Sequence, residues 1–272
     1  MPDSKTFLSM NYQLTGLFIY PIKSLGGIEV ESAEILEEGF KYDRRWMLVD
    51  EKGKFLSQRQ LPKMSLFKCS FSGLRILVEY QGDSIQIPFD QHSFNVLEVE
   101  VWGSKLKANE VDNEISNWFS KRLDVSCSLV TMTDVSSRMK EFVKPPFTSR
   151  VSMADGYPYL ILGTASVQEL NTRLLTPLPI DRFRANIIIE TNKAHAEDEW
   201  EDAMIGDCVL KIIKPCARCI ITTIDQQTSS KGVEPLKTLA SYRKINNKIY
   251  FGANAIALNN GIINKGDYLT VY

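Results

Sequence analysis

The sequence lacks the features that mark a membrane-spanning or exported protein. No stretch approaches the roughly 20 consecutive apolar residues that a transmembrane helix needs. The N-terminal residues, MPDSKTFLSMNYQ, contain neither the apolar core of a signal peptide nor an Arg-rich amphipathic pattern. The five cysteines are odd in number and irregularly spaced, which does not suit a secreted disulfide framework. We therefore expect a cytoplasmic protein with no membrane partner.

An excess of charge of either sign is also missing. Lys and Arg together number 32 and Asp and Glu 33, so the formal net charge is −1. A global positive field that would attract nucleic acid is absent, and we expect no nucleic-acid partner. Any anion site must be built locally from a few converging cations. The 272 residues are enough to bury roughly three quarters of the unfolded surface, in one large domain or two smaller ones.

Alternating apolar and polar residues in the first half predict β structure. Residues 27–35 alternate with period two, and residues 94–102 alternate again and stop at Trp102-Gly103. Residues 74–80 and 85–89 suit the two strands of a hairpin. Short strands at this spacing are typical of a small barrel or sandwich.

Helical periodicity appears in only a few places. Asp112 is a candidate N-cap for a helix that ends near Leu123, and Ser166-Val167-Gln168-Glu169 fits a capping box. A further short helix is predicted around residues 236–242. We expect a mixed α/β, mainly β fold with a few helices, divided into domains at 10–130 and 131–272. Further strands are predicted near residues 45–49, 55–57, 186–190, 209–213, 248–255 and 267–271.

The most informative segment is Cys216-Ala217-Arg218-Cys219, which runs into the β-branched residues 220–225. A guanidinium near a thiol favours the anionic thiolate. A soft, anionic sulfur is also a ligand that a redox-active transition metal accepts. The β-branched run favours a strand over a helix.

Four interpretations of the cysteine pair stay open. Two buried structural cysteines would be ordinary but would leave the Arg between them unexplained. Structural zinc takes four ligands, whereas the chain offers only two His and no second Cys-x-x-Cys. A thioredoxin-type redox pair begins a helix, which the β-branched run does not favour. The fourth is one thiolate on a metal held mainly by a cofactor, which requires an anion-binding pocket elsewhere.

Several cationic segments could form such a pocket. Lys23-Ser24 precedes Gly26-Gly27, where a backbone can approach an anion closely. Arg44 and Arg45 open a predicted strand and should point to opposite faces, and Arg59 closes the partner strand.

A second group of polar residues precedes the strand predicted at 186–190. Arg184 and Asn186 should share a face of it, where an Arg beside an Asn can bind a planar heterocycle. For each of these cationic segments taken alone, a solvated strand end or a buried ion pair is the favoured interpretation.

Taken in order, these segments resemble the MOSC family in its two-part form with an N-terminal β-barrel domain. Within that family the chain is most similar to the mitochondrial amidoxime-reducing components and their bacterial relatives. The resemblance extends from about residue 14 to the C-terminus. The matching segments are Tyr20–Ser24, Asp43–Trp46, Ser57–Gln60, Phe183–Asn186, Ile205–Asp207, Cys216–Ile220, Glu234–Leu239 and Lys265–Asp267.

The resemblance implies a β-barrel MOSC domain that binds a molybdenum cofactor, in which a pyranopterin dithiolene (molybdopterin) holds molybdenum and one protein Cys completes the coordination. It implies Cys219 as the metal ligand, and Cys219 with Asp155 as the catalytic residues. Phosphate would be bound by Lys23, Ser24 and Arg44, and the pterin by Arg184 and Asn186. The full implied cofactor-binding set is Lys23, Ser24, Arg44, Arg59, Asp155, Arg184, Asn186 and Arg218.

The function implied by the resemblance is reduction of small N-hydroxylated or N-oxide compounds. Because the sequence shows no Cys-rich ferredoxin-like extension, electrons are expected from a separate donor protein, a ferredoxin-, flavodoxin- or cytochrome b5-like reductase chain. Tungsten suits the same ligands as molybdenum. The alternative is a cofactor-binding or sulfur-carrier module whose reactive Cys carries a persulfide.

Overall fold

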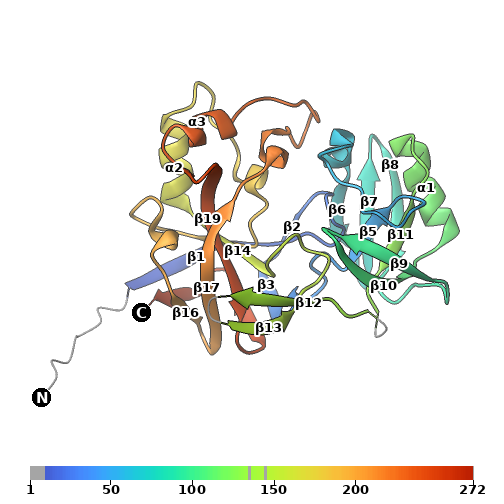
Figure 1. Cartoon of the computed structure of the whole chain (residues 1–272), viewed down its shortest axis with the longest axis horizontal. Helices are drawn as coiled ribbons and strands as arrows, with labels where there is room; N and C mark the ends of the chain where they lie inside the picture. Colours follow the sequence, from blue (N-terminus) through green and yellow to red (C-terminus); the bar gives the residue numbers. More distant parts are fainter. Residues whose placement is uncertain (1–9, 134–135, 144–145, 272) are drawn as a thin grey trace, which may run out of the picture.

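The computed structural model describes residues 10–133, 136–143 and 146–271, and its largest element is a closed seven-stranded barrel (Figure 1). The strands of the barrel, in spatial order, are β14 (Tyr159–Gly163), β15 (Ile187–Ile189), β1 (Met10–Ile19), β21 (Tyr268–Val271), β16 (Asp202–Ile205), β17 (Cys208–Ala217) and β19 (Lys248–Ala257). β19 pairs with β14 and closes the ring. β14 and β15 run parallel, and the other neighbours are antiparallel.

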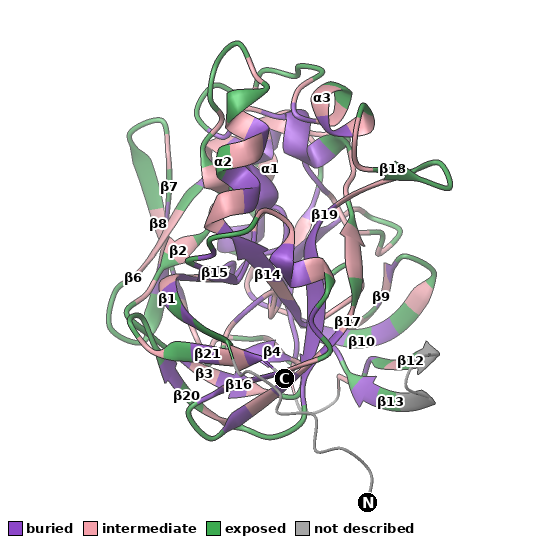
Figure 2. Cartoon of the chain, turned by 90° about the vertical axis from the view of Figure 1, so that its left-hand side faces the viewer, coloured by how far each residue is buried: buried purple, intermediate pink, exposed green. Residues whose placement is uncertain are grey.

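The barrel interior is filled by aliphatic side chains from alternate positions of its strands. This alternation follows from the pleat, which sends successive side chains to opposite faces. Figure 2 shows β14, β15 and β19 mostly in the colour of buried residues. Buried members of this core are Leu14, Leu17, Ile161, Ile187, Ile189, Ile205, Leu210, Ala253, Ala255 and Leu269.

A second β-rich unit occupies the opposite side of the molecule (Figure 1). One of its sheets has the order β5 (Trp46–Val49), β11 (Ser128–Thr131), β10 (Ser104–Glu110), β9 (Val96–Val101). The other has the order β6 (Lys68–Phe71), β7 (Arg75–Tyr80), β8 (Asp83–Pro88). Trp46, Phe67 and Phe119 are the largest side chains of their common core, which α1 (Asn113–Leu123) helps to cover. The mainly β fold predicted from the sequence is thus confirmed.

The first strands of the chain do not belong to this second unit. β1 lies in the barrel between β15 and β21, and β3 (Ser32–Leu36) pairs with β20 (Gly261–Asn264). Residues near the N-terminus therefore build the same sheets as the C-terminal strands, and the polypeptide leaves the barrel only afterwards. The predicted division at residue 130 stays a prediction.

The remaining elements are short. They are β2 (Ile28–Glu29), β4 (Gly39–Phe40), β12 (Met139–Val143), β13 (Pro146–Arg150), β18 (Lys244–Ile245), α2 (Thr164–Thr172), α3 (Leu236–Ala240) and the 3-10 turns η1 (Pro62–Leu66), η2 (Ile180–Phe183), η3 (Ala196–Asp198) and η4 (Ile220–Thr223). Among the described residues, no helix is both long and apolar enough to span a bilayer.

The two predicted helix caps have different outcomes. Asp112 caps α1 as predicted, because its carboxylate accepts hydrogen bonds from the N–H groups of Glu114 (2.7 Å) and Ile115 (3.2 Å). The capping box at Ser166 is wrong, since α2 already begins at Thr164. The Ser166 hydroxyl instead donates to the buried carboxylate of Glu197.

Three predicted strands also differ from the structure. The β-branched run after Cys219 forms the 3-10 turn η4, not a strand. The Thr222 and Thr223 hydroxyls donate to the carbonyls three residues earlier (3.0 and 2.8 Å), a local bond that a strand would not allow. The predicted strand 27–35 is broken into β2 and β3. The strand predicted at 55–57 is reduced to an isolated bridge between Phe55 and Val49, and Arg59, which was expected to close it, lies in a turn.

Candidate functional site

Cys219 is held at the point where β17 has ended and η4 begins. The backbone N–H of Arg218 donates to the carbonyl of Ile249 on β19 (2.7 Å), which fixes the motif against the barrel wall. Cys219 itself is the N-terminal cap residue of η4, in an extended conformation, and its side chain is partly exposed. The thiol is therefore anchored by backbone bonds on both sides and still reachable from outside.

Arg59 joins this thiol to the acidic residue implied by the resemblance. Its Nη2 donates to Cys219 Sγ (3.3 Å) and to Asp155 Oδ2 (2.9 Å). Lys23 Nζ contacts the other oxygen of Asp155 and donates to the carbonyl of Met153 (2.9 Å). Four of the predicted site residues thus form one continuous chain of polar contacts, although they lie far apart in the sequence.

The ionisation states of Lys23, Arg59 and Asp155 depend on one another. Burial lowers the pKa of Lys23, and the Asp155 carboxylate only partly offsets this effect. Burial would raise the pKa of Asp155, but the charges of Lys23 and Arg59 outweigh it and hold that pKa well below its usual range. Asp155 is therefore an anion at neutral pH, and it links two cations that would otherwise repel each other.

A second polar group surrounds Arg44. Its Nη1 donates to Asp43 Oδ2 (2.6 Å) and to Asn186 Oδ1 (3.0 Å), and Asp43 is 1% exposed. The Arg44 carbonyl accepts from the N–H of Met153 (3.0 Å), the residue whose carbonyl binds Lys23. The two polar groups are consequently neighbours.

Arg184 lies on the same side of the barrel as Arg44. The two guanidinium groups lie 4.3 and 4.4 Å from the centre of the Tyr20 ring, and Arg184 Nη1 donates to the Leu25 carbonyl (2.7 Å). Burial lowers the pKa of Arg184 to about 10, and the charges of Asp43 and Asp155 offset this effect only in part. A partly buried cation that forms no ion pair among the described residues is a favourable position for an anionic ligand.

The predicted arrangement of Arg184 and Asn186 on one strand face is wrong. Arg184 ends η2 in the left-handed conformation (φ +53°), and β15 begins only at Ile187. Asn186 reaches the site through its own side chain, which bonds both Arg44 and Asp43. Arg44 likewise lies in a turn with φ +49°, before β5.

The guanidinium of the cysteine motif is not the one that contacts Cys219. Arg218 Nη1 donates to Cys216 Sγ (3.2 Å) and its Nη2 to the Phe183 carbonyl (2.6 Å). Arg59 takes the place beside Cys219 instead. The sequence could not show this, because the two residues meet only through the fold.

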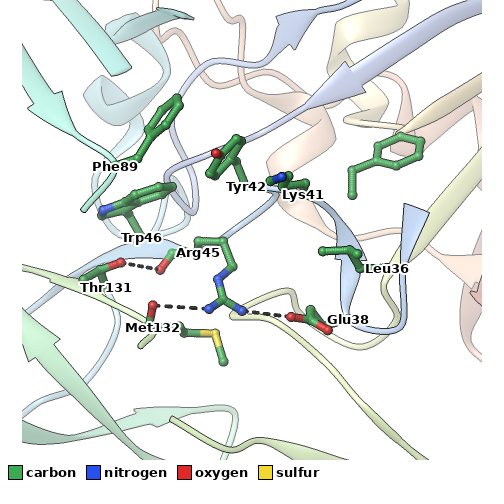
Figure 3. Close-up of a pocket in the computed structure, with 10 residues that line it drawn as sticks. Leu36, Glu38, Lys41, Tyr42, Arg45, Trp46, Phe89, Thr131 and Met132 are labelled. Atoms are coloured by element: carbon green, nitrogen blue, oxygen red, sulfur yellow. Dashed lines mark hydrogen bonds and ion pairs between the residues drawn. The ribbon is translucent and has the colours of Figure 1, made fainter. Parts of the chain in front are cut away.

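Ser24 and Arg45 are the remaining residues of the cationic segments whose positions were predicted. Ser24 is buried with φ +69°, and its carbonyl accepts from Gln58 Nε2 (2.9 Å). The side chain of Arg45 has different partners from that of Arg44. Figure 3 shows it between Glu38 (3.1 Å) and the Met132 carbonyl (3.2 Å), where it lines a cavity of about 250 Å³ that contains none of the predicted site residues.

The residues present fit an anionic cofactor with one thiolate ligand. Within the part of the chain that the structure describes, Lys23, Arg44 and Arg59 form ion pairs with Asp43 and Asp155 alone, and Arg184 forms none. Arg59 Nη1 and Arg218 Nε are buried and have no hydrogen-bond partner within the described residues. No cluster of three or more His, Cys, Asp or Glu in the described part of the chain could hold a metal ion alone. A metal at Cys219 would take its other ligands from a cofactor.

Sequence reasoning missed two residues of this region. Asp43 anchors Arg44 and Asn186, and Trp102 covers Arg59 with its indole ring (4.7 Å). Asp43 belongs to a matching segment, but the sequence did not indicate that its side chain is buried. Trp102 was recognised only as the end of a predicted strand.

Comparisons with known proteins identify both halves of the chain. The model of the MOSC N-terminal beta barrel domain matches residues 11–126, and that of the MOSC domain matches residues 148–270. Mitochondrial amidoxime-reducing component 1 of Mus musculus is 34% identical and aligns with 84% of this chain and 70% of that protein. Mitochondrial amidoxime reducing component 2 of Bos taurus is 32% identical, over 89% and 75%. Molybdenum cofactor sulfurase of Bombyx mori is 30% identical, over 97% of this chain and 34% of that protein.

Proposed function

The chain belongs to the MOSC family, and from that premise we propose that it is a molybdenum-cofactor-dependent enzyme that reduces N-hydroxylated or N-oxide compounds. The observation that carries the proposal is the Cys219 thiol, in hydrogen-bond contact with Arg59 at the edge of a cluster of cations in which Lys23 is buried and Arg44, Arg59 and Arg184 are partly buried. The similarity to two amidoxime-reducing components supports the substrate class.

The cationic residues would bind the cofactor. In this proposal Lys23 and Arg44, with Ser24, would bind its phosphate, and Arg184 with Asn186 would bind its pterin. Cys219 would be the single protein ligand of the metal. When bound, the cofactor supplies two-electron redox chemistry at molybdenum.

The protein's own residues orient the thiol and set the local charge. Arg59 donates to Cys219 Sγ and Asp155 together, so the sulfur is fixed relative to the carboxylate. Lys23 and Arg59 keep Asp155 ionised. Because its pKa is held well below the usual range, Asp155 would act as a fixed negative charge that positions Lys23 and Arg59 beside the thiol.

The reaction consumes two electrons and two protons for each N–O bond broken. An N-hydroxylated compound, R–NH–OH, yields the amine R–NH2 and one water. The electrons would come from a separate ferredoxin-, flavodoxin- or cytochrome b5-like donor chain, and we place the protein in the cytoplasm.

The test is reduction of an aromatic amidoxime by the cofactor-loaded protein, with reduced viologen as the electron source. Cys219→Ala should abolish turnover. Cys216→Ala is the matched control, because its sulfur contacts Arg218 and not Arg59, and it should retain activity. Full activity of Cys219→Ala would refute the proposal.

A sulfur-carrier role is the second candidate, favoured by the match of 97% of this chain to part of a molybdenum cofactor sulfurase. In that role Cys219 would carry a persulfide. Intact mass spectrometry of the protein, before and after reduction with a thiol, distinguishes the two. A labile addition of one sulfur atom on Cys219, without amidoxime reduction, would support the carrier.

A further inference from the structure

The turn between β9 and β10 contains an aromatic residue in an unfavourable backbone conformation. Trp102 (φ +52°) and Gly103 (φ +79°) both adopt the left-handed region. Two-residue hairpin turns of this type favour Asn-Gly or Asp-Gly, whereas a bulky residue at positive φ is an outlier. The turn itself does not require an indole ring, so the presence of Trp at this position needs an explanation outside the turn.

The indole lies over the guanidinium that contacts Cys219. Its centre is 4.7 Å from Arg59 Cζ and 5.2 Å from the Phe55 ring. The Phe55 ring in turn lies 5.0 Å from Lys23 Nζ. The two aromatic rings therefore cover both cations that hold Asp155. The turn is at the end of the hairpin that faces the barrel (Figure 1).

Trp102 nevertheless leaves much of its surface to solvent. It is 53% exposed, and Arg59 is already fixed by its bonds to Asp155 and Cys219. Because one planar guanidinium makes both contacts, the indole centre lies less than about 10 Å from Cys219 Sγ. That separation accommodates one aromatic ring carrying an N-hydroxyl group.

A second exposed apolar residue is adjacent to Cys219 in the chain. Ile220, which directly follows Cys219, is 48% exposed. Exposed apolar groups beside a charged, thiol-containing site are typical of a binding surface for a partly apolar small molecule. Trp102 comes from the N-terminal unit and Ile220 from the barrel.

We propose that Trp102 is a substrate-binding residue: its exposed face forms one wall of the approach to Cys219 and stacks on flat aromatic substrates. The enzyme would then prefer aromatic over aliphatic N-hydroxylated compounds. This inference rests on the proposed function, and it assigns a selectivity role to the N-terminal unit.

The experiment compares benzamidoxime with acetamidoxime as probes of the molybdenum-loaded enzyme. We measure kcat/KM and, by titration calorimetry in the oxidised enzyme, the Kd of each compound. Trp102→Ala should lower kcat/KM for benzamidoxime about fivefold to tenfold, mainly through KM, as expected for the loss of one aromatic stacking contact. Acetamidoxime should change less than about twofold on the same reasoning.

Two further variants control the result. Trp102→Phe keeps a ring and should retain most of the preference. Phe94→Ala removes an aromatic side chain of the same unit that is 99% exposed, has no described contact with the site, and should change neither probe. Molybdenum content is measured in each variant to verify loading.

The outcomes separate the two proposals. An unchanged benzamidoxime-to-acetamidoxime ratio in Trp102→Ala, in both kcat/KM and Kd, overturns the role of Trp102, even if both activities fall together. A wild-type enzyme that binds benzamidoxime preferentially, through Trp102, but reduces neither compound supports the aromatic wall and refutes the proposed function.

Discussion

Removal of Arg44 should destabilise the fold as well as the cofactor site. The Asp43 side chain is fully buried and that of Arg44 is 14% exposed, so Arg44→Met leaves an anion without its cation. Breaking such a pair from one side costs about 3–5 kcal/mol. Asp43 keeps hydrogen bonds from the N–H of Tyr20 (2.8 Å) and from Asn186 Nδ2 (3.2 Å). We therefore expect a loss near the lower end, about 3 kcal/mol.

The loss should depend on pH with a definite sign. Burial already raises the pKa of Asp43, and Arg44 opposes this rise. Without Arg44 the native pKa rises further above the unfolded value of 3.8, so the native state of the variant binds the proton more tightly. The free energy of unfolding of Arg44→Met should therefore fall as pH rises from about 4 towards the raised native pKa, and recover on acidification.

Urea denaturation at pH 7 and pH 5 measures this effect. The protein is made in cells that cannot synthesise the cofactor, so that ligand binding does not contribute to stability. Asp43→Asn combined with Arg44→Met removes the buried charge and should be more stable than Arg44→Met alone. A loss below about 1 kcal/mol at pH 7, or an equal loss at both pH values, would refute the reasoning.

Three further predictions concern stability and thiol reactivity. Asp112→Ala should lower the free energy of unfolding by about 1 kcal/mol in urea, while Asn117→Ala on the same helix should not; equal effects would contradict a capping role. Gly261→Ala would press its Cβ against Cys208 Sγ and cost about 1–3 kcal/mol, which Cys208→Ala should partly restore in the double variant. Iodoacetamide at pH 8 should leave Cys69 unmodified in the native protein, because burial raises its pKa to about 12; labelling of Cys69 by mass spectrometry before unfolding would contradict this.

Sequence patterns correctly predicted those elements that are stabilised by interactions between residues close together in the chain. The β7–β8 hairpin and the Asp112 cap follow from alternation and from a side chain that bonds nearby N–H groups. The run after Cys219 was misassigned because strand propensity reflects packing on a sheet, and no neighbouring strand is present there. Two threonine hydroxyls bonding back to the chain favour the 3-10 turn instead.

The residues of the site were predictable from the sequence, but the contacts between their side chains were not. Lys23, Arg59 and Cys219 were named from matching segments and Asp155 from the same resemblance, and the structure connects all four. That Arg59 and not Arg218 contacts Cys219 depends on how the N-terminal unit docks on the barrel. Contacts of this kind carry no signature of spacing or period, because they join segments 160 residues apart.

The most direct test of the account is the metal content of the purified protein. Elemental analysis of wild type made in cofactor-competent cells should find close to one molybdenum per chain, retained in Cys216→Ala and reduced or lost in Cys219→Ala. Wild-type protein without molybdenum, when a known molybdenum enzyme from the same cells is loaded, would contradict the central claim.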